Sequence, residues 1–301
     1  MSWIAIALIA AAISAVVSIF DKTVIHRYAT SPLTLPLIIG IAQTAVGLTV
    51  LAVVRTPPEA SAEAVGWAVG SGVLFGLGGQ ILIRTLFTLE VSRTIPVYQT
   101  FPVFAALIAV VFLDEVVTPS QWVAIGATVA GAAALSVRTG AGYKTLFLHR
   151  AFFVLMVGSV LMGAAQVTGK AAVDELPVLF THGLRMLALG LVFLSFNLRS
   201  VPLREVAGFV RDRSPALLFV GANELVIANV SLLLTLWALS LGPVSLVSAL
   251  IGTRALYVVV FSTGLALVWK GALGEETSRQ AVAVKVGATA VIVAGVAGIA
   301  L

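Results

Sequence analysis

The sequence predicts an all-α integral membrane protein with ten transmembrane helices, arranged as two inverted five-helix repeats. Of its 301 residues, 60% are hydrophobic and 10% are charged, whereas a soluble domain carries about 25% charged residues. Apolar runs of bilayer-spanning length occur ten times along the chain. The pattern of the first half recurs in the second, and an odd number of helices per half makes the second unit enter the membrane from the opposite side.

Each predicted helix is an apolar run of about 20 residues, the length that crosses the hydrocarbon core. The ten runs are 3–21, 33–54, 65–88, 94–113, 119–137, 151–170, 177–197, 215–239, 243–268 and 281–300. The segments between them carry Pro, Gly and charged residues typical of loops, and 198–215 is interpreted as one of these loops. The runs lack the alternation of barrel strands, so helices are the expected spanning structure.

The two halves repeat each other in sequence. "TLFTLEVSRTIPVYQT" (85–100) aligns with "TLWALSLGPVSLVSAL" (235–250), and the segment 114–131 aligns with 275–295. The same alignment places Lys22 opposite Lys170. We therefore predict two structural units, residues 1–140 and 148–301.

The distribution of charge indicates a membrane orientation. The formal net charge is +5, and most Lys and Arg residues fall in odd-numbered loops, which the positive-inside rule assigns to the cytoplasm. Both termini are then expected to face outward, in a multi-pass protein of the inner membrane. This basic bias is interpreted as a membrane signal, so no nucleic-acid partner is expected.

The ends of the repeats resemble the drug/metabolite transporter superfamily, in its EamA-type ten-helix branch. The features that carry the resemblance are Pro102, Glu115, Gln121, Gly126 and Gly131 in the first half, and Glu276, Gln280, Gly287 and Gly295 in the second. The resemblance implies a carrier of metabolites, amino acids or drugs, often an exporter, without a soluble cofactor. The second half departs from the first, because it has Gly252-Thr253-Arg254 in place of the Pro102 region.

Three ionisable residues fall at membrane depth in the second half. At about 1.5 Å per residue, Glu224 lies roughly 13 Å from the membrane face where its predicted helix begins. Arg185 and Arg254 enter from the opposite face and lie roughly 13 Å and 17 Å deep. All three are therefore expected near one level. Such residues are costly in lipid and mark functional sites by default. One interpretation is a structural ion pair between Glu224 and either arginine.

The other interpretation is that one arginine is left over and binds an anionic group of the substrate, because a guanidinium matches carboxylate geometry. Glu224 then orients the arginine or takes a proton as the coupling ion. The first half offers Gln43, Tyr98 and Gln99 as cavity-lining candidates, with helix packing as the alternative for the glutamines.

Two lysines and two pairs of polar residues mark helix ends. Lys22 and Lys170, at the ends of their apolar runs, are candidates for gating or the substrate mouth, with interface anchoring as the alternative. Thr118 with Gln121, and Thr277 with Gln280, predict capping boxes preceded by acidic residues.

The function expected from the sequence is secondary transport of a small metabolite, amino-acid-like or anionic or zwitterionic, by alternating access, and export is the expected direction. The alternative is a multidrug or organic-cation exporter. An enzyme is not expected, because there is no cysteine and the three histidines are scattered, so no catalytic residue, metal site or cofactor is predicted. The expected partners are the substrate, the bilayer and a proton or other coupling ion, with the protein a monomer or homodimer.

Overall fold

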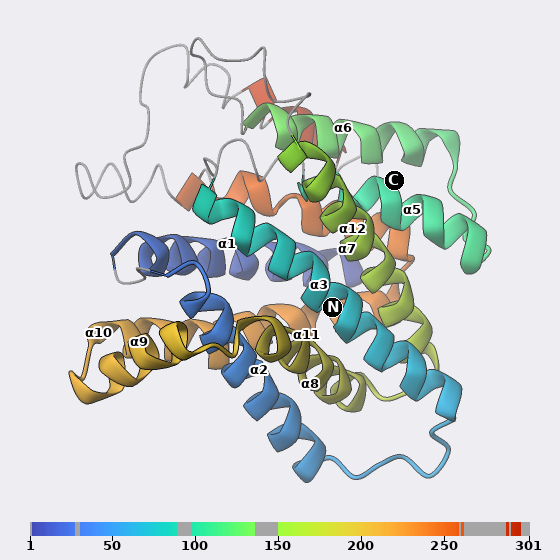
Figure 1. The fold of residues 1–301 in the computed structure, drawn as a ribbon. Coiled ribbons are helices and arrows are strands. Elements are labelled where there is room, and N and C mark those ends of the chain that lie inside the picture. Colours follow the sequence, from blue (N-terminus) through green and yellow to red (C-terminus); the bar gives the residue numbers. More distant parts are fainter. Residues whose placement is uncertain are drawn as a thin grey trace.

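The fold is built from helices throughout the part of the chain that the structure describes (Figure 1). The computed structural model describes residues 2–27, 31–88, 98–135, 150–258, 260–261, 287–288 and 290–295. Within these ranges, six helices are long and apolar enough to cross a membrane. The predicted all-α membrane fold is confirmed, while the ten-helix count and the division into units 1–140 and 148–301 stay predictions.

Most predicted runs agree with an observed helix to within a few residues. The helices are α1 (Trp3–Arg27), α2 (Thr34–Val53), α3 (Ala62–Thr88), α5 (Phe101–Phe112), α6 (Pro119–Leu135), α7 (Arg150–Glu175), α8 (Val178–Asn197), α9 (Ser200–Arg211), α10 (Pro215–Gly221), η2 (Ala222–Ile227), α11 (Ala228–Leu241) and α12 (Val244–Gly252). The predicted spans 94–113, 243–268 and 281–300 lie partly outside the described residues.

Three predicted boundaries are wrong. α1 continues to Arg27 and α7 to Glu175, so Lys170 lies inside a helix and not at its end. Its ammonium group pairs with Asp174 at 2.6 Å, one turn further on, and this pairing lets the helix continue past the charge. The segment 198–215, interpreted as a loop, contains the helix α9, because its Val, Leu and Phe residues recur at helical spacing between the arginines.

The predicted span 215–239 is one helical rod with an irregular middle. α10, η2 and α11 follow one another without a break, and η2 is a π-helical segment centred on Glu224 and Leu225. A π-bulge widens the turn and leaves a backbone carbonyl without its usual partner. The carbonyl oxygen of Glu224 instead accepts from the side-chain amides of Gln43 at 3.1 Å and Asn229 at 2.6 Å, so packing against α2 holds the bulge in place.

The two halves of the chain pack through each other. The main packed pairs are α2 with α8, α3 with α7, α1 with α11 and α5 with α12. In the predicted repeat, α1, α2, α3 and α5 correspond to α7, α8, α11 and α12. Exchanging corresponding helices turns the packed pair α1–α11 into α7–α3 and the pair α5–α7 into α12–α1, and all of these pairs are observed. The pairs α2–α8 and α5–α12 are unchanged by the exchange. This is the pattern that a two-fold relation between the repeats requires.

Two glycines of the repeat make the same contact from opposite sides. A methyl group on Gly131 would meet the side chain of Ile292 at 2.6 Å, and one on Gly295 would meet the side chain of Thr128. Glycine at both positions therefore allows α6 and the segment 290–295 to pack closely, as small residues do in membrane helix pairs. This contact gives a physical reason for two of the residues on which the family resemblance rests.

An acidic residue from the first half caps a helix of the second. The carboxylate of Glu115 accepts from the backbone N–H groups of Val244 and Ser245, and from the Ser245 hydroxyl at 2.7 Å. It thereby satisfies donors at the N-terminus of α12, where negative charge is favourable. The predicted capping box is confirmed by the bonds from Thr118 N to Gln121 Oε1 at 3.0 Å and from Gln121 N to Thr118 Oγ1 at 3.3 Å. The second box, Thr277 with Gln280, lies outside the described residues.

Close helix approach also positions a candidate site residue, and this leads to a first prediction. A methyl group on Gly72 of α3 would meet the backbone oxygen of Arg185 and the Cβ of Ala188 at 2.7 Å, whereas nothing lies within 4 Å of one on Gly66. We expect Gly72→Ala to destabilise the protein by about 1–3 kcal/mol through overpacking. Gly66→Ala, one helix face away, should be neutral or stabilising by up to about 1 kcal/mol.

Thermal unfolding of the purified protein, followed by tryptophan fluorescence, measures both glycine variants. An unfolding temperature for Gly72→Ala equal to that of Gly66→Ala would show that α3 and α8 can separate at no cost.

Candidate functional site

The centre of the candidate site is a pair of carboxyl groups joined by one amide. Asn223 Nδ2 donates to Asp21 Oδ1 at 2.8 Å and to Glu224 Oε1 at 3.0 Å, and the two acids are within hydrogen-bonding reach of each other. Gln43 Nε2 lies 3.4 Å from the other oxygen of Glu224. We call Asp21 and Glu224 the carboxyl pair; it joins α1 to η2 within the bundle.

Arg254 lies on the α1 side of the carboxyl pair. It follows the end of α12, and its Nε donates to the Ser18 hydroxyl at 2.8 Å, with a second bond from Nη2. Arg254 also interacts electrostatically with Asp21 and with Tyr98. Asp21 therefore interacts with Arg254 as well as with Glu224.

Arg185 is the largest fully buried side chain in the described part of the chain, and it has few partners there. It is 0% exposed, its Nη2 donates to Gln166 Oε1 at 3.4 Å, and its Cζ lies 4.8 Å from the ring centroid of Phe75. Its Nε and Nη1 have no hydrogen-bond partner among the residues that the structure describes. A guanidinium carries five N–H donors and is costly to bury unpaired, so the two unpaired donor nitrogens of this buried cation can receive an anionic group.

A short chain of polar groups connects Arg185's helix to the carboxyl pair. His182, one turn before Arg185 on α8, has Nε2 3.2 Å from Asn229 Oδ1. Asn229 in turn donates to the backbone oxygen of Glu224. The ring nitrogen Nδ1 of His182 has no partner. The acidic and basic parts of the site are thus two neighbouring clusters, bridged by Asn229.

The predicted site residues divide between these clusters. Glu224, Gln43 and Arg254 meet around Asp21, while Arg185 lies in the second cluster with Gln166 and Phe75. Within the described residues, Glu224 forms no ion pair with either arginine; its carboxylate is held by amides instead. The direct pairing considered from the sequence is therefore not the arrangement observed.

Tyr98 and Gln99 are buried, at 5% and 7% exposure, and precede α5. Pro102 occupies the first turn of α5, where its missing N–H needs no partner. The side chain of Lys22 lies outside the described residues, and Lys170 is paired with Asp174, so a mouth or gating role for either lysine stays a prediction.

The sequence reasoning missed Asp21, Asn223 and Ser18. Asp21 is the last residue of the predicted span 3–21, and the continuation of α1 to Arg27 instead places it within the helix. Spacing offered one usable signal, because Ser18 and Asp21 are three residues apart and so share a helix face. Asn223 precedes Glu224 directly, and only the π-helical turn aims both side chains at α1.

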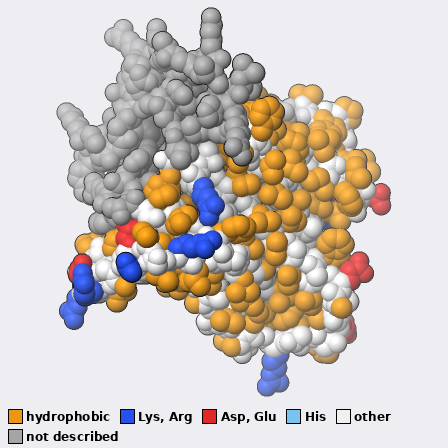
Figure 2. All heavy atoms as spheres, in the orientation of Figure 1, with side chains coloured by type: hydrophobic (Ala, Val, Ile, Leu, Met, Phe, Trp, Pro, Cys, Tyr) orange, Lys and Arg blue, Asp and Glu red, His pale blue; other side chains and the backbone are white. Residues whose placement is uncertain are grey.

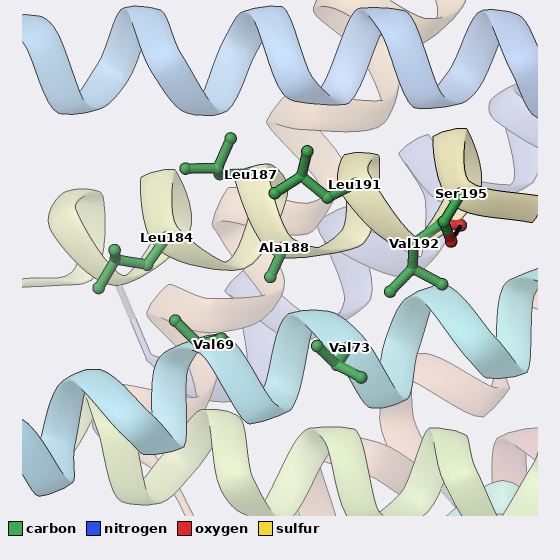
Figure 3. Close-up of a pocket in the computed structure, with 8 residues that line it drawn as sticks. All are labelled: Val69, Val73, Leu184, Leu187, Ala188, Leu191, Val192 and Ser195. Atoms are coloured by element: carbon green, nitrogen blue, oxygen red, sulfur yellow. Dashed lines mark hydrogen bonds between the residues drawn. The ribbon is translucent and has the colours of Figure 1, made fainter. Parts of the chain in front are cut away.

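A groove lies between α3 and α8 (Figure 3). It has a volume of about 340 Å³ and is lined by Val69, Val73, Leu184, Leu187, Ala188, Leu191, Val192 and Ser195. Leu191 is 52% exposed, and seven of the eight lining side chains are apolar. This groove suits lipid chains, and the polar clusters lie among the packed helices instead.

Comparisons with known proteins agree with the fold and with the resemblance. Residues 1–137 match the sequence model of the EamA-like transporter family. A solved structure, described only as "Crystal structure of protein", superposes with a TM-score of 0.69 at 19% identity, over 98% of this chain and 94% of that chain. At this identity the likeness concerns the fold alone. No curated protein matches the sequence.

The match over residues 1–137 points to the general activity. Proteins of the EamA-like family are membrane transporters of small solutes, and the apolar helices described above supply the spans such a protein needs. The chain is accordingly an integral, multi-pass membrane protein, and its residues 1–137 are similar to the EamA-like transporter family.

Proposed function

We propose that the protein is a secondary transporter of small anionic or zwitterionic metabolites, amino-acid-like in size, which it exports across the inner membrane by alternating access. The observation that carries this proposal is Arg185, a fully buried arginine with two donors free. A carboxylate can accept two parallel bonds from such a guanidinium. The ring of Phe75 packs against one face of the Arg185 guanidinium, so the orientation of the guanidinium is set before the substrate binds.

The carboxyl pair supplies the coupling step in this proposal. Among the described residues, one guanidinium, that of Arg254, interacts with Asp21, and Asp21 interacts with Glu224, so a single additional positive charge balances this cluster of two acids and one base. A proton provides it in one state of the cycle. The shared amide of Asn223 keeps both acids in place whether or not the proton is bound, which lets the site load and unload without unfolding the bulge.

A specific observation also favours the alternative of an organic-cation exporter. The carboxyl pair could receive the cationic group of a drug in place of a proton, since buried acids attract cations. The free donors of Arg185 count against this alternative, because a guanidinium facing the substrate repels cations. The two proposals therefore differ in the charge of the ligand that each cluster binds.

A ligand screen on detergent-purified protein tests the proposal. The unfolding temperature is measured by tryptophan fluorescence with amino acids, dicarboxylates, nucleosides, sugar phosphates and organic cations. A ligand at about 100 times its Kd stabilises by about 2.7 kcal/mol, so binders raise the midpoint by several degrees. Stabilisation by anionic or zwitterionic compounds, lost in Arg185→Met, is the expected result; stabilisation by bulky cations alone would overturn it.

A further inference from the structure

The helix α9 carries a second feature that the transport site does not use. It lies at one end of the molecule, after α8 ends and before α10 begins (Figure 1). Its twelve residues extend about 18 Å at 1.5 Å per residue, too short to cross a bilayer. Both neighbouring spans reach the same side of the membrane here, so α9 lies at the level of a membrane surface.

The sides of α9 differ in their surroundings. At about 100° per residue, Pro202, Val206 and Phe209 share one face, and Pro202 is buried. Leu203 and Val210 lie together on the neighbouring face of the helix, and their side chains are 42% and 60% exposed. A helix with a strongly apolar face and a basic face is typical of segments that lie in the membrane interface.

Arginines border the exposed apolar strip. Arg204 and Arg211 are seven residues apart and therefore lie on one face, next to the strip; both are exposed. Arg199 and Arg213 flank the helix at its two ends and are also exposed. Figure 2 shows basic side chains at the end of the molecule where α9 and α10 lie, beside acidic and hydrophobic ones.

The acidic residues of this region are already engaged. Glu205 accepts from the hydroxyl of Thr34 at the start of α2, and this bond ties α9 to the bundle. Asp212 pairs with Arg211 at 3.1 Å, with both side chains largely exposed, a geometry that contributes little. The surface therefore keeps a net positive charge directly beside exposed apolar side chains.

We propose that α9 with its flanking arginines is a binding surface for anionic phospholipids. Leu203 and Val210 enter the acyl-chain region, while Arg199, Arg204, Arg211 and Arg213 hold the phosphate groups. Clusters of four or more basic residues on an amphipathic helix next to a span have this chemistry. The same surface belongs to an odd-numbered loop, so it also fits the predicted cytoplasmic side, where anionic lipids carry the surface charge.

Two single-cysteine labels test the placement of α9, because the chain has no cysteine of its own. Val201 and Val210 are nearly equally exposed, at 62% and 60%, but nine residues place them on opposite sides of the helix. A nitroxide at Val210→Cys is expected to collide with oxygen in the bilayer and one at Val201→Cys with a water-soluble nickel chelate. Equal access of both labels to the chelate would overturn the proposal.

Lipid binding is measured on protein in nanodiscs of phosphatidylcholine containing phosphatidylglycerol, by native mass spectrometry. Each basic residue near a surface contributes about fivefold in affinity, so Arg204→Gln/Arg211→Gln should retain phosphatidylglycerol about 25-fold less well. Arg204→Lys/Arg211→Lys keeps the charge and should retain most of it, as should Arg55→Gln on another exposed segment. Inorganic phosphate should not displace the lipid. Equal retention by the glutamine variant and the wild type would overturn the assignment.

Discussion

Replacing Arg185 with methionine is expected to abolish transport while the protein still inserts and becomes more stable. Truncating one partner of a buried charge pair costs about 2–5 kcal/mol, so the transport rate should fall about 100-fold or more. Stability should rise by about 1–3 kcal/mol, because methionine removes a buried charge that has two free donors and fills a similar volume. Transport into proteoliposomes and the unfolding temperature measure the two effects.

A matched control exists on α3. Arg84 also lies over a phenylalanine ring, with its Cζ 5.8 Å from the centroid of Phe196, but its Nη2 donates to Phe196 O and Asn197 Oδ1. Arg84→Met should keep transport, and Arg185→Lys should keep a part of it, because the charge stays and the fork is lost. Normal transport by Arg185→Met would show that Arg185 does not belong to the transport site. A parallel fall in stability and transport would show that its role is structural.

Glu224→Gln is expected to keep substrate exchange across the membrane while losing the coupling of transport to protons. Glutamine keeps the size of the side chain and can bond to Gln43 and Asn223, but it cannot carry a proton. Exchange of labelled substrate between the two sides of a vesicle should continue at a rate within a fewfold of the wild type. Accumulation driven by a pH gradient should fall about tenfold or more. Asp21→Asn should behave in the same way, because both acids share one amide donor.

Glu175 provides the control for this prediction. Its carboxylate accepts from the hydroxyl of Ser61 at 3.0 Å, at the exposed end of α7, and Glu175→Gln should leave both exchange and accumulation unchanged. Concentrative uptake by Glu224→Gln would show that the carboxyl pair does not carry the coupling proton. Loss of exchange as well as accumulation would assign the pair to substrate binding and favour the cation exporter.

Much of the fold could be predicted because a bilayer simplifies the chain's choices. A backbone in lipid must satisfy its hydrogen bonds internally, so an apolar run of about 20 residues has one stable form. The runs at 33–54 and 177–197 therefore agree with α2 and α8 to within one residue at each end. The prediction of a loop at 198–215 was wrong, because this segment is not an apolar run. A short amphipathic helix at the surface is recognised by the difference between its two sides and not by its mean hydropathy.

The site was predicted less well than the helices that build it. Burial cost singled out Glu224, Arg185 and Arg254, since charged residues in apolar runs are rare. Their partners could not be read in the same way. Ser18, Asn223 and Gln166 are small polar residues that occur in many membrane helices, and nothing in their spacing says which helix they face.

The sequence by itself determined the class of the protein and the positions of most spans, because hydrophobicity and periodicity are local properties of the chain; the repeat that relates its halves stays a prediction. The tertiary structure alone decided which charges meet. Asp21 reaches Glu224 because α1 packs on η2 across 200 residues of sequence, and the π-turn points Asn223 at both acids. Arg185 keeps two donors free because its neighbours on α7 and α3 offer it one amide and one ring. Such pairings depend on the register between packed helices, and the pattern within one helix does not contain that register.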